Sequence, residues 1–187
     1  MALRLFRTTG YSTLLMPGEA RLAMHPVWLV VATSLWLGLA CNVALWRLVL
    51  GPERDLRTAA ASVLLIAGGA GAVLSLLGWR RTLKFSATVL LLAGALAACG
   101  LWVQGLPLET LWQQRPRALL PGWASFMRWQ VPTLMFLLAL VPIVSLWNVQ
   151  VRRLPGPAQL QVNVTGAVLG AVAFLLGFLL QQDLVHA

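Results

Sequence analysis

Residues 26–50, with the sequence PVWLVVATSLWLGLACNVALWRLVL, decide the fold class of this chain. The run is apolar over almost its whole length, and only Asn42 and Arg47, near its end, carry strongly polar side chains. A helix of about 20 residues, at roughly 1.5 Å per residue, crosses the roughly 30 Å hydrocarbon core of a bilayer. We therefore predict that this run is a membrane-spanning helix.

The composition extends this prediction to the whole chain. Hydrophobic residues make up 59% of the 187 residues, charged residues make up 10%, and the mean hydropathy is +0.81, too apolar for a water-soluble domain. Four more apolar runs of spanning length follow, at residues 58–78, 83–103, 131–149 and 162–182. Lipid offers the backbone no hydrogen-bond partner, so each run must be a helix. We predict an all-α integral membrane fold, a five-helix transmembrane bundle over residues 26–182.

The positive charges predict how this bundle is oriented. Fourteen Lys and Arg residues against five acidic ones give a net charge of +9. Because they lie mostly between the runs, beside the lipid headgroups, they indicate membrane topology and no nucleic-acid binding. The short basic connectors WRRTLK (79–84) and VRRLPG (151–156) belong in the cytoplasm by the positive-inside rule. We predict a cytoplasmic N-terminal segment, 1–25, and a C-terminal end, 183–187, on the opposite, outer side of the membrane.

Small and polar residues inside the runs predict where helices meet, since lipid removes most of the hydrophobic drive for association. Gly71 in the second run and Gly166 and Gly170 in the fifth are candidates for close helix packing. Asn42 is a candidate for a hydrogen bond to a neighbouring helix. We interpret Asn163, in the sequon NVT, as the N-cap of the fifth helix, because our topology places it in the cytoplasm, where no glycosylation occurs.

Arg47 and Trp36 differ in their position along the first run. Arg47 lies about one turn from its end, so we expect its guanidinium to reach the outer interface. Trp36 lies in the middle, whereas six other tryptophans lie near the ends of runs, as indole rings prefer. Cys41 and Cys99 are predicted to lie at similar depths. A disulfide between them is geometrically conceivable, and two buried thiols are the more common arrangement.

The connector 104–130 is longer than chain closure requires. It mixes apolar residues with Arg, Glu, Trp and Pro, and we predict an amphipathic segment lying at the outer interface of the membrane. Arg115 and Arg117, beside Trp112, are candidates for binding lipid phosphates, because a guanidinium matches phosphate geometry. A passive interfacial loop is the alternative.

Residues suited to catalysis are scarce. The two histidines, His25 and His186, lie at opposite ends of the bundle, and the five carboxylates are spread over four segments. We find no sequence motif of a nucleophile, a metal site or a phosphate-binding loop. We predict no catalytic residue, no metal site and no cofactor in this chain. Without a charged residue at the centre of a span, a transporter or channel is disfavoured.

Three stretches resemble the membrane domain of bacterial lipid A phosphoethanolamine transferases. ACNVALWR (40–47) is similar to the end of the family's first span, and two later stretches are similar to its fourth and fifth spans: PTLMFLLALVPIVSLWNVQVRR (132–153) and QLQVNVTGAVLGAV (159–172). The resemblance covers roughly residues 25–183. In the long connector, Glu109 matches an acidic position of the family, which adds it to the candidates for lipid contact.

The resemblance implies a multi-pass domain in the inner membrane of a bacterium, with its C-terminal end in the periplasm. This domain would anchor a periplasmic sulfatase-like catalytic domain and help present phosphatidylethanolamine and lipid A. The zinc and the acceptor threonine of the family belong to that catalytic domain, which this chain lacks. We therefore expect the chain to be non-catalytic alone. A free-standing multi-pass scaffold or partner protein is the alternative, and a small transporter is a third possibility.

Overall fold

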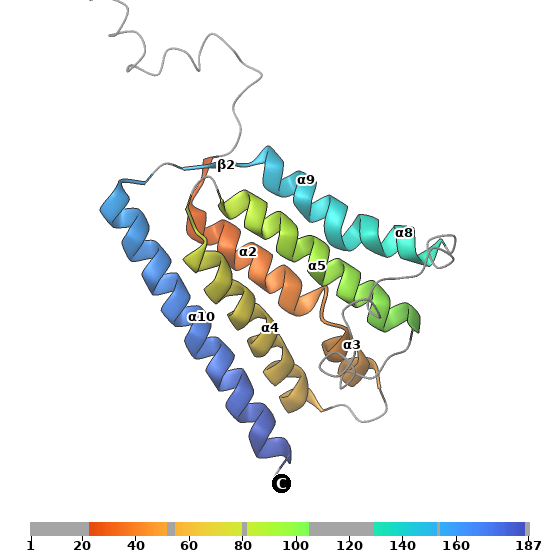
Figure 1. The fold of residues 1–187 in the computed structure, drawn as a ribbon. Helices are drawn as coiled ribbons and strands as arrows, with labels where there is room; N and C mark the ends of the chain where they lie inside the picture. Colours follow the sequence, from red (N-terminus) through yellow and green to blue (C-terminus); the bar gives the residue numbers. More distant parts are fainter. Residues whose placement is uncertain (1–22, 52–54, 80–81, 105–128, 153, 186–187) are drawn as a thin grey trace, which may run out of the picture.

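The computed structural model describes residues 23–51, 55–79, 82–104, 129–152 and 154–185, nearly all of them in apolar helices (Figure 1). Four helical stretches are long and apolar enough to cross a membrane, and a bent pair of helices forms a fifth such segment. The helices are α2 (Pro26–Leu39), α3 (Val43–Leu50), α4 (Leu56–Leu76), α5 (Leu83–Gln104), α8 (Gln130–Met135), π-helical η4 (Phe136–Leu140), α9 (Val141–Asn148) and α10 (Gly156–Val185). The prediction of an apolar helical chain with several spanning segments is confirmed.

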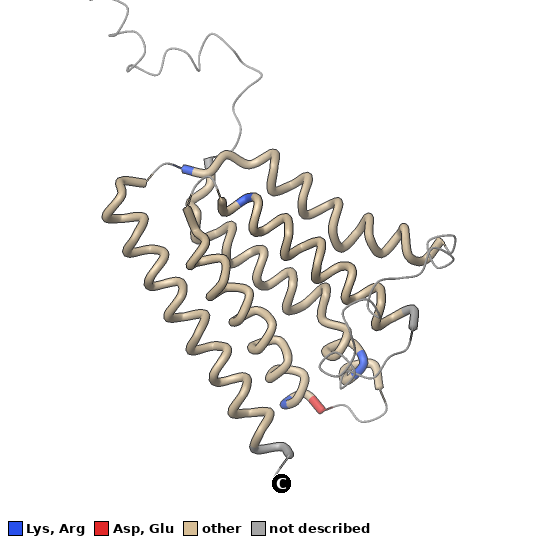
Figure 2. The backbone as a smooth tube through the Cα atoms, viewed as in Figure 1, with Lys and Arg blue, Asp and Glu red and all other residues tan. Residues whose placement is uncertain are grey.

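The helices lie side by side, with α10 at one edge and α8–η4–α9 at the other (Figure 1). Helix α4 packs against α10 and α2, and α5 packs between α2 and the α8–α9 stretch. We call the two ends of the bundle the β1 end and the α3 end. The β1 end holds the starts of α2, α5 and α10, and the α3 end holds the start of α4 and the end of α10. The described charged residues lie at these two ends (Figure 2).

A short parallel strand pair closes the β1 end. Strand β1 (Ala23–Met24) pairs with β2 (Gln150–Val151), and the Arg152 amide donates to the Met24 carbonyl over 2.9 Å. The pair fixes the start of α2 beside the end of α9, although its partners Met24 and Val151 are 127 residues apart in the sequence.

The first run is not one continuous helix, contrary to the prediction for residues 26–50. Helix α2 ends at Leu39, α3 begins at Val43, and their axes differ by 49°. Asn42 causes the break because its backbone is extended, with φ −84° and ψ 91°, and its side chain caps α3. The run has the length and composition of one span but contains the signal that starts a second helix.

The fourth span contains a π-helical turn, η4, between α8 and α9. Pro142, at the start of α9, has no N–H to donate to the carbonyl of Leu138, four residues earlier. Trp36 donates its indole N–H to that carbonyl over 3.1 Å. The mid-span tryptophan of α2 therefore satisfies a backbone group of the fourth span that apolar surroundings would leave unpaired.

Helix α10 begins earlier than predicted, at Gly156 instead of residue 162. Pro157 occupies its first turn, where a missing backbone N–H costs nothing. Asn163 therefore lies inside the helix, and its interpretation as an N-cap is wrong. Its Oδ1 accepts a hydrogen bond from Gln159 Nε2 over 2.9 Å. Gln159 Nε2 also donates to the Gly78 carbonyl over 2.9 Å, which joins α10 to the end of α4.

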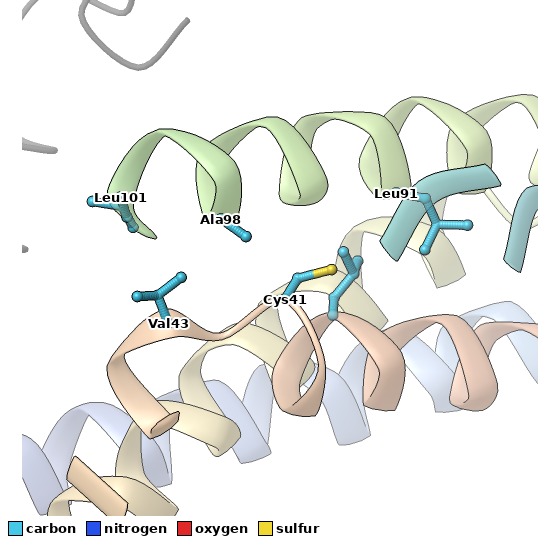
Figure 3. Close-up of a cluster of buried hydrophobic side chains, with 6 residues drawn as sticks. Cys41, Val43, Leu91, Ala98 and Leu101 are labelled. Atoms are coloured by element: carbon cyan, nitrogen blue, oxygen red, sulfur yellow. The ribbon is translucent and has the colours of Figure 1, made fainter. Parts of the chain in front are cut away.

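A cluster of buried apolar side chains joins the first two helices to α5 (Figure 3). Cys41 and Val43, at the break, face Leu91, Ala98 and Leu101 of α5 in this cluster. Cys41 and Cys99 are both buried free thiols, so the arrangement without a disulfide is the one that the structure has.

Candidate functional site

The break between α2 and α3 places three polar side chains of the stretch ACNVALWR at the α3 end. Asn42 is only 1% exposed. Its Oδ1 accepts from the Leu45 amide over 3.1 Å, and its Nδ2 donates to Ser62 Oγ, on α4, over 3.0 Å. Ser62 in turn donates to the Ala59 carbonyl over 2.8 Å. The amide that ends one helix therefore both caps the next and connects it to a third.

Trp46 compensates for the backbone bond that the break removes. In a continuous helix the Leu39 carbonyl would accept from the amide of Val43. Here Trp46 Nε1 donates to that carbonyl over 2.9 Å. The ring itself stays 42% exposed, at the rim of the bundle. The indole thus satisfies a carbonyl that the hydrocarbon could not, while its ring lies where lipid would contact it.

Arg47 connects α3 to the last turn of α5. Its Nη2 donates to the Leu101 carbonyl over 2.7 Å. The last carbonyls of a helix carry partial negative charge, so a guanidinium is favourable there. The sequence places Arg47 near the end of the first run, and α5 provides it with a defined partner that the sequence did not indicate.

An apolar cavity of about 220 Å³ lies beside this cluster, between α3, α5 and the start of the fourth span. The tryptophans Trp46 and Trp102, from facing helices, both line it and are 42% and 52% exposed. The remaining lining residues are Ala40, Val43, Leu50, Ala98, Leu134 and Leu138. A cavity with aliphatic walls and indole rings at its rim is suited to an acyl chain at a membrane interface.

Asp55 caps the neighbouring helix at the same end. Its Oδ1 accepts from the amides of Arg57 and Thr58 over 3.0 and 3.2 Å, and its Oδ2 accepts from the Thr58 hydroxyl. Hydrogen bonds from Thr58 lower the pKa of Asp55 below its ordinary value. The bond from the Thr58 hydroxyl has the larger effect, and the bond from the Thr58 amide adds to it. The carboxylate therefore stays ionised at the positive end of α4.

The glycines predicted to lie at helix contacts all lie between helices. A Cβ on Gly71 would come 3.4 Å from Ser34 Oγ of α2. A Cβ on Gly166 would come 2.5 Å from Ser75 Oγ, and one on Gly170 would come 2.5 Å from the Ala72 backbone nitrogen, both on α4. A Cβ on Gly68, a glycine that the sequence did not single out, would likewise come 2.5 Å from the backbone nitrogen of Phe174, on α10. The close spacing of Gly68, Gly69 and Gly71 in the sequence could have indicated this helix contact.

The predicted lipid contacts of the long connector, Glu109, Trp112, Arg115 and Arg117, lie outside the described residues. Within the part of the chain that the structure describes, no group of three or more His, Cys, Asp or Glu residues could hold a metal ion. Those residues therefore offer no site for the zinc that the resemblance associates with the catalytic domain. What they do offer is apolar cavities bordered by hydrogen-bonded helix ends.

Comparisons with known proteins add no relative. A scan against family models, a search of curated proteins and a search of solved structures each gave no match to this chain.

Proposed function

We propose that this chain is the membrane domain of a phosphoethanolamine transferase-like protein that modifies lipid A. It lies in the inner membrane of a bacterium, with its N-terminus in the cytoplasm and its C-terminus in the periplasm. It anchors the enzyme and helps present lipid substrate at the periplasmic side. The chain performs no transfer alone, and a sulfatase-like periplasmic domain supplies the zinc and the acceptor threonine.

One observation carries this proposal. The stretch ACNVALWR, which carries part of the resemblance to the family, contributes Ala40, Val43 and Trp46 to the wall of the 220 Å³ cavity at the α3 end. Trp46, from this stretch, faces that cavity together with Trp102 of α5. Arg47, the next residue, lies at the end of α5 through its bond to Leu101. A site that holds a phospholipid at an interface is expected to have aliphatic walls that contact the acyl chain, indole rings at its rim and a guanidinium near the phosphate.

The placement of α10 supports the same function. Its last turn lies at the α3 end, as does the start of α4 with Asp55 and Arg57 (Figures 1 and 2). In the proposed topology this end is periplasmic. A catalytic domain attached to α10 would therefore work on the same side as the cavity.

Lipid binding by the purified full chain tests the proposal. We expect native mass spectrometry of delipidated protein to show tighter binding of phosphatidylethanolamine and lipid A than of phosphatidylcholine. Leu50→Trp should weaken this binding by filling the cavity, since Leu50 lines it and is 71% exposed. Leu56→Trp is the matched control, because Leu56 is equally exposed, at 72%, and lies outside the cavity lining.

Equal affinity for the three lipids would contradict the proposal and favour a membrane scaffold. The double variant Arg115→Ala with Arg117→Ala tests the predicted contacts of the connector, and unchanged lipid preference would remove them from the site. The DNA sequence beyond codon 187 and in the neighbouring gene separates the two functions. A sulfatase-like reading frame supports the transferase, and an unrelated one favours the scaffold.

A further inference from the structure

Two apolar cavities lie in one seam, the boundary between the first run and the fourth span on the surface of α5. The first is the cavity at the α3 end, to which the fourth span contributes Leu134 and Leu138. The second, of about 300 Å³, lies toward the β1 end between α2 and α9, and Leu91 of α5 also lines it. Trp36 lines the second cavity, so its indole bond to the Leu138 carbonyl lies between the two cavities.

The backbone of the fourth span is irregular beside this bond. In η4 the Val141 amide donates to the carbonyl of Phe136, five residues earlier, as in a π-helix. Pro142 follows and has no N–H to donate. Prolines and π-helical turns are the usual places at which a helix bends. The Leu138 carbonyl, which Trp36 holds over 3.1 Å, lies within this turn, so the bond acts where the fourth span bends most easily.

The two halves of the fourth span are held differently on either side of η4. At the β1 end, β2 pairs with β1, and Lys84, at the start of α5, donates its ammonium to the Val149 carbonyl over 2.6 Å. At the α3 end, α8 begins without a side-chain cap among the described residues and contacts α5. A bend at η4 would therefore carry α8 along α5 and away from α2, while α9 stays fixed beside the strand pair.

We propose that the fourth span is a gate hinged at η4, and that the Trp36–Leu138 hydrogen bond is the latch that keeps the seam closed. In the closed form, which the structure shows, the indole separates the two cavities. In the open form the bond is broken, α8 has moved away from α2, and the two cavities form one groove along the seam. The gate itself does not depend on the proposed function. Its use, which is to admit an acyl chain to the cavity at the α3 end, rests on that function.

Cys41 provides a reporter of the open form. It is 9% exposed and belongs to the buried cluster against which Leu138 and Ile143 of the fourth span pack. Opening of the gate withdraws these two side chains and uncovers the thiol. When opening and closing are fast, the rate at which a reagent modifies a buried group is proportional to the population of the open form. In the full chain with Cys99→Ala, Cys41 is the one remaining thiol, and its alkylation by N-ethylmaleimide therefore measures the gate.

Removing the latch should speed this alkylation. We expect Trp36→Phe to raise the rate about fivefold, the effect of losing one neutral hydrogen bond. Adding Pro142→Ala removes the proline of the hinge and supplies an N–H to the Leu138 carbonyl, so the rate should return to near that of the parent chain. An unchanged rate in Trp36→Phe would overturn the proposal. A rate that stays raised in the double variant would do the same, because it would show that the smaller ring exposes Cys41 locally.

A thiol on another helix separates gate opening from general loosening of the bundle. Ser75 of α4 is 4% exposed, and α10 covers it, since a Cβ on Gly166 would come 2.5 Å from its Oγ. Ser75→Cys, in a chain in which Cys41 and Cys99 are alanine, is the matched control. Trp36→Phe should leave the alkylation rate of this thiol unchanged. Equal acceleration at Cys41 and at position 75 would contradict a gate between α2 and the fourth span.

Lipid exchange tests the use of the gate. The probe is phosphatidylethanolamine with a fluorescent acyl chain, released from the preloaded full chain into an excess of unlabelled lipid. We expect Trp36→Phe to speed release several-fold, and Trp36→Phe with Pro142→Ala to release at the parent rate. Unchanged release together with faster Cys41 alkylation would overturn lipid entry through the gate. If the unmodified chain does not bind phosphatidylethanolamine, the proposed function fails, and the alkylation rates of Cys41 still decide whether the gate exists.

Discussion

Trp46 donates its indole N–H to the carbonyl of Leu39 over 2.9 Å, across the break that separates α3 from α2. The carbonyl lost its helical donor when the chain turned at Asn42, and the indole, one helical turn further on, replaces that donor. A break of this kind is tolerated in a membrane because side chains satisfy the freed backbone groups. Asn42, Trp46 and Arg47 thus hold the α3 end together through bonds to three different segments.

Removing the indole donor should destabilise the break. We expect Trp46→Phe to lower the free energy of unfolding by about 1 kcal/mol, since the ring remains and only the hydrogen bond is lost. Unfolding in mixed detergent micelles, followed by circular dichroism, measures the change. Trp28→Phe is the control, because Trp28 is 62% exposed on α2 and should tolerate the same substitution. Equal stability of the two variants would show that the bond to Leu39 contributes little.

Trp36 and Pro142 should be coupled through the Leu138 carbonyl. Trp36→Phe removes the donor that reaches this carbonyl over 3.1 Å, at a cost of about 1 kcal/mol. Pro142→Ala supplies a backbone N–H that the carbonyl could accept instead. In a double-mutant cycle on unfolding free energy, Trp36→Phe should therefore cost less in the Pro142→Ala background. Additive effects of the two substitutions would contradict this role for the indole.

Gly170 should be indispensable to the contact between α10 and α4. A Cβ there would come 2.5 Å from the Ala72 nitrogen, a backbone atom that cannot move aside alone. We expect Gly170→Val to cost about 1–3 kcal/mol, the usual range for overpacking. Gly156→Ala, where a Cβ would meet nothing within 4 Å, is the control. Detergent unfolding of both variants compares them directly, and similar stabilities would mean that α10 packs less closely than described.

The sequence located the apolar segments well and their interruptions poorly. Predicted run 58–78 corresponds to Leu56–Leu76, and run 83–103 to Leu83–Gln104, because length and hydropathy alone define a span. The break at Asn42 was missed because the sequence of an apolar run does not show whether an amide side chain caps a new helix or bonds to a neighbouring helix. The early start of α10 was missed for a related reason: GPAQLQ is too polar for a span, yet Pro157 is a helix-start signal.

The candidate site could be predicted only in part. Asn42 and Arg47 attract notice in the sequence because they are polar within an apolar run. Their partners Ser62 and Leu101 are 20 and 54 residues away, and only the packing of α3 on α4 and α5 brings them together.

The stability of the α4 start should depend on pH through Asp55. Its pKa is lowered in the folded chain by the bonds from Thr58, so its ionised form stabilises the folded state. This contribution is fully present above the unfolded pKa, at about pH 4, and is lost as the pH falls through the lower folded value. We expect thermal stability to fall with acidification below about pH 4. Asp55→Asn, which keeps a capping oxygen, should reduce that dependence, and an identical pH profile for the variant would assign the acid sensitivity to other carboxylates.

Reporter fusions should give alternating sides along the chain. In the proposed orientation we expect fusions after Trp79 and Arg153 to lie in the cytoplasm, and fusions after Gln114 and Ala187 in the periplasm. The alternation follows from the helix directions, because α4 and α9 end at the β1 end while α5 and α10 run away from it (Figure 1). A fluorescent protein that matures in the cytoplasm and a phosphatase that is active only in the periplasm measure opposite sides at each position. Phosphatase activity after Arg153 would invert the orientation and place the α3 cavity in the cytoplasmic leaflet, where it could not serve lipid A modification.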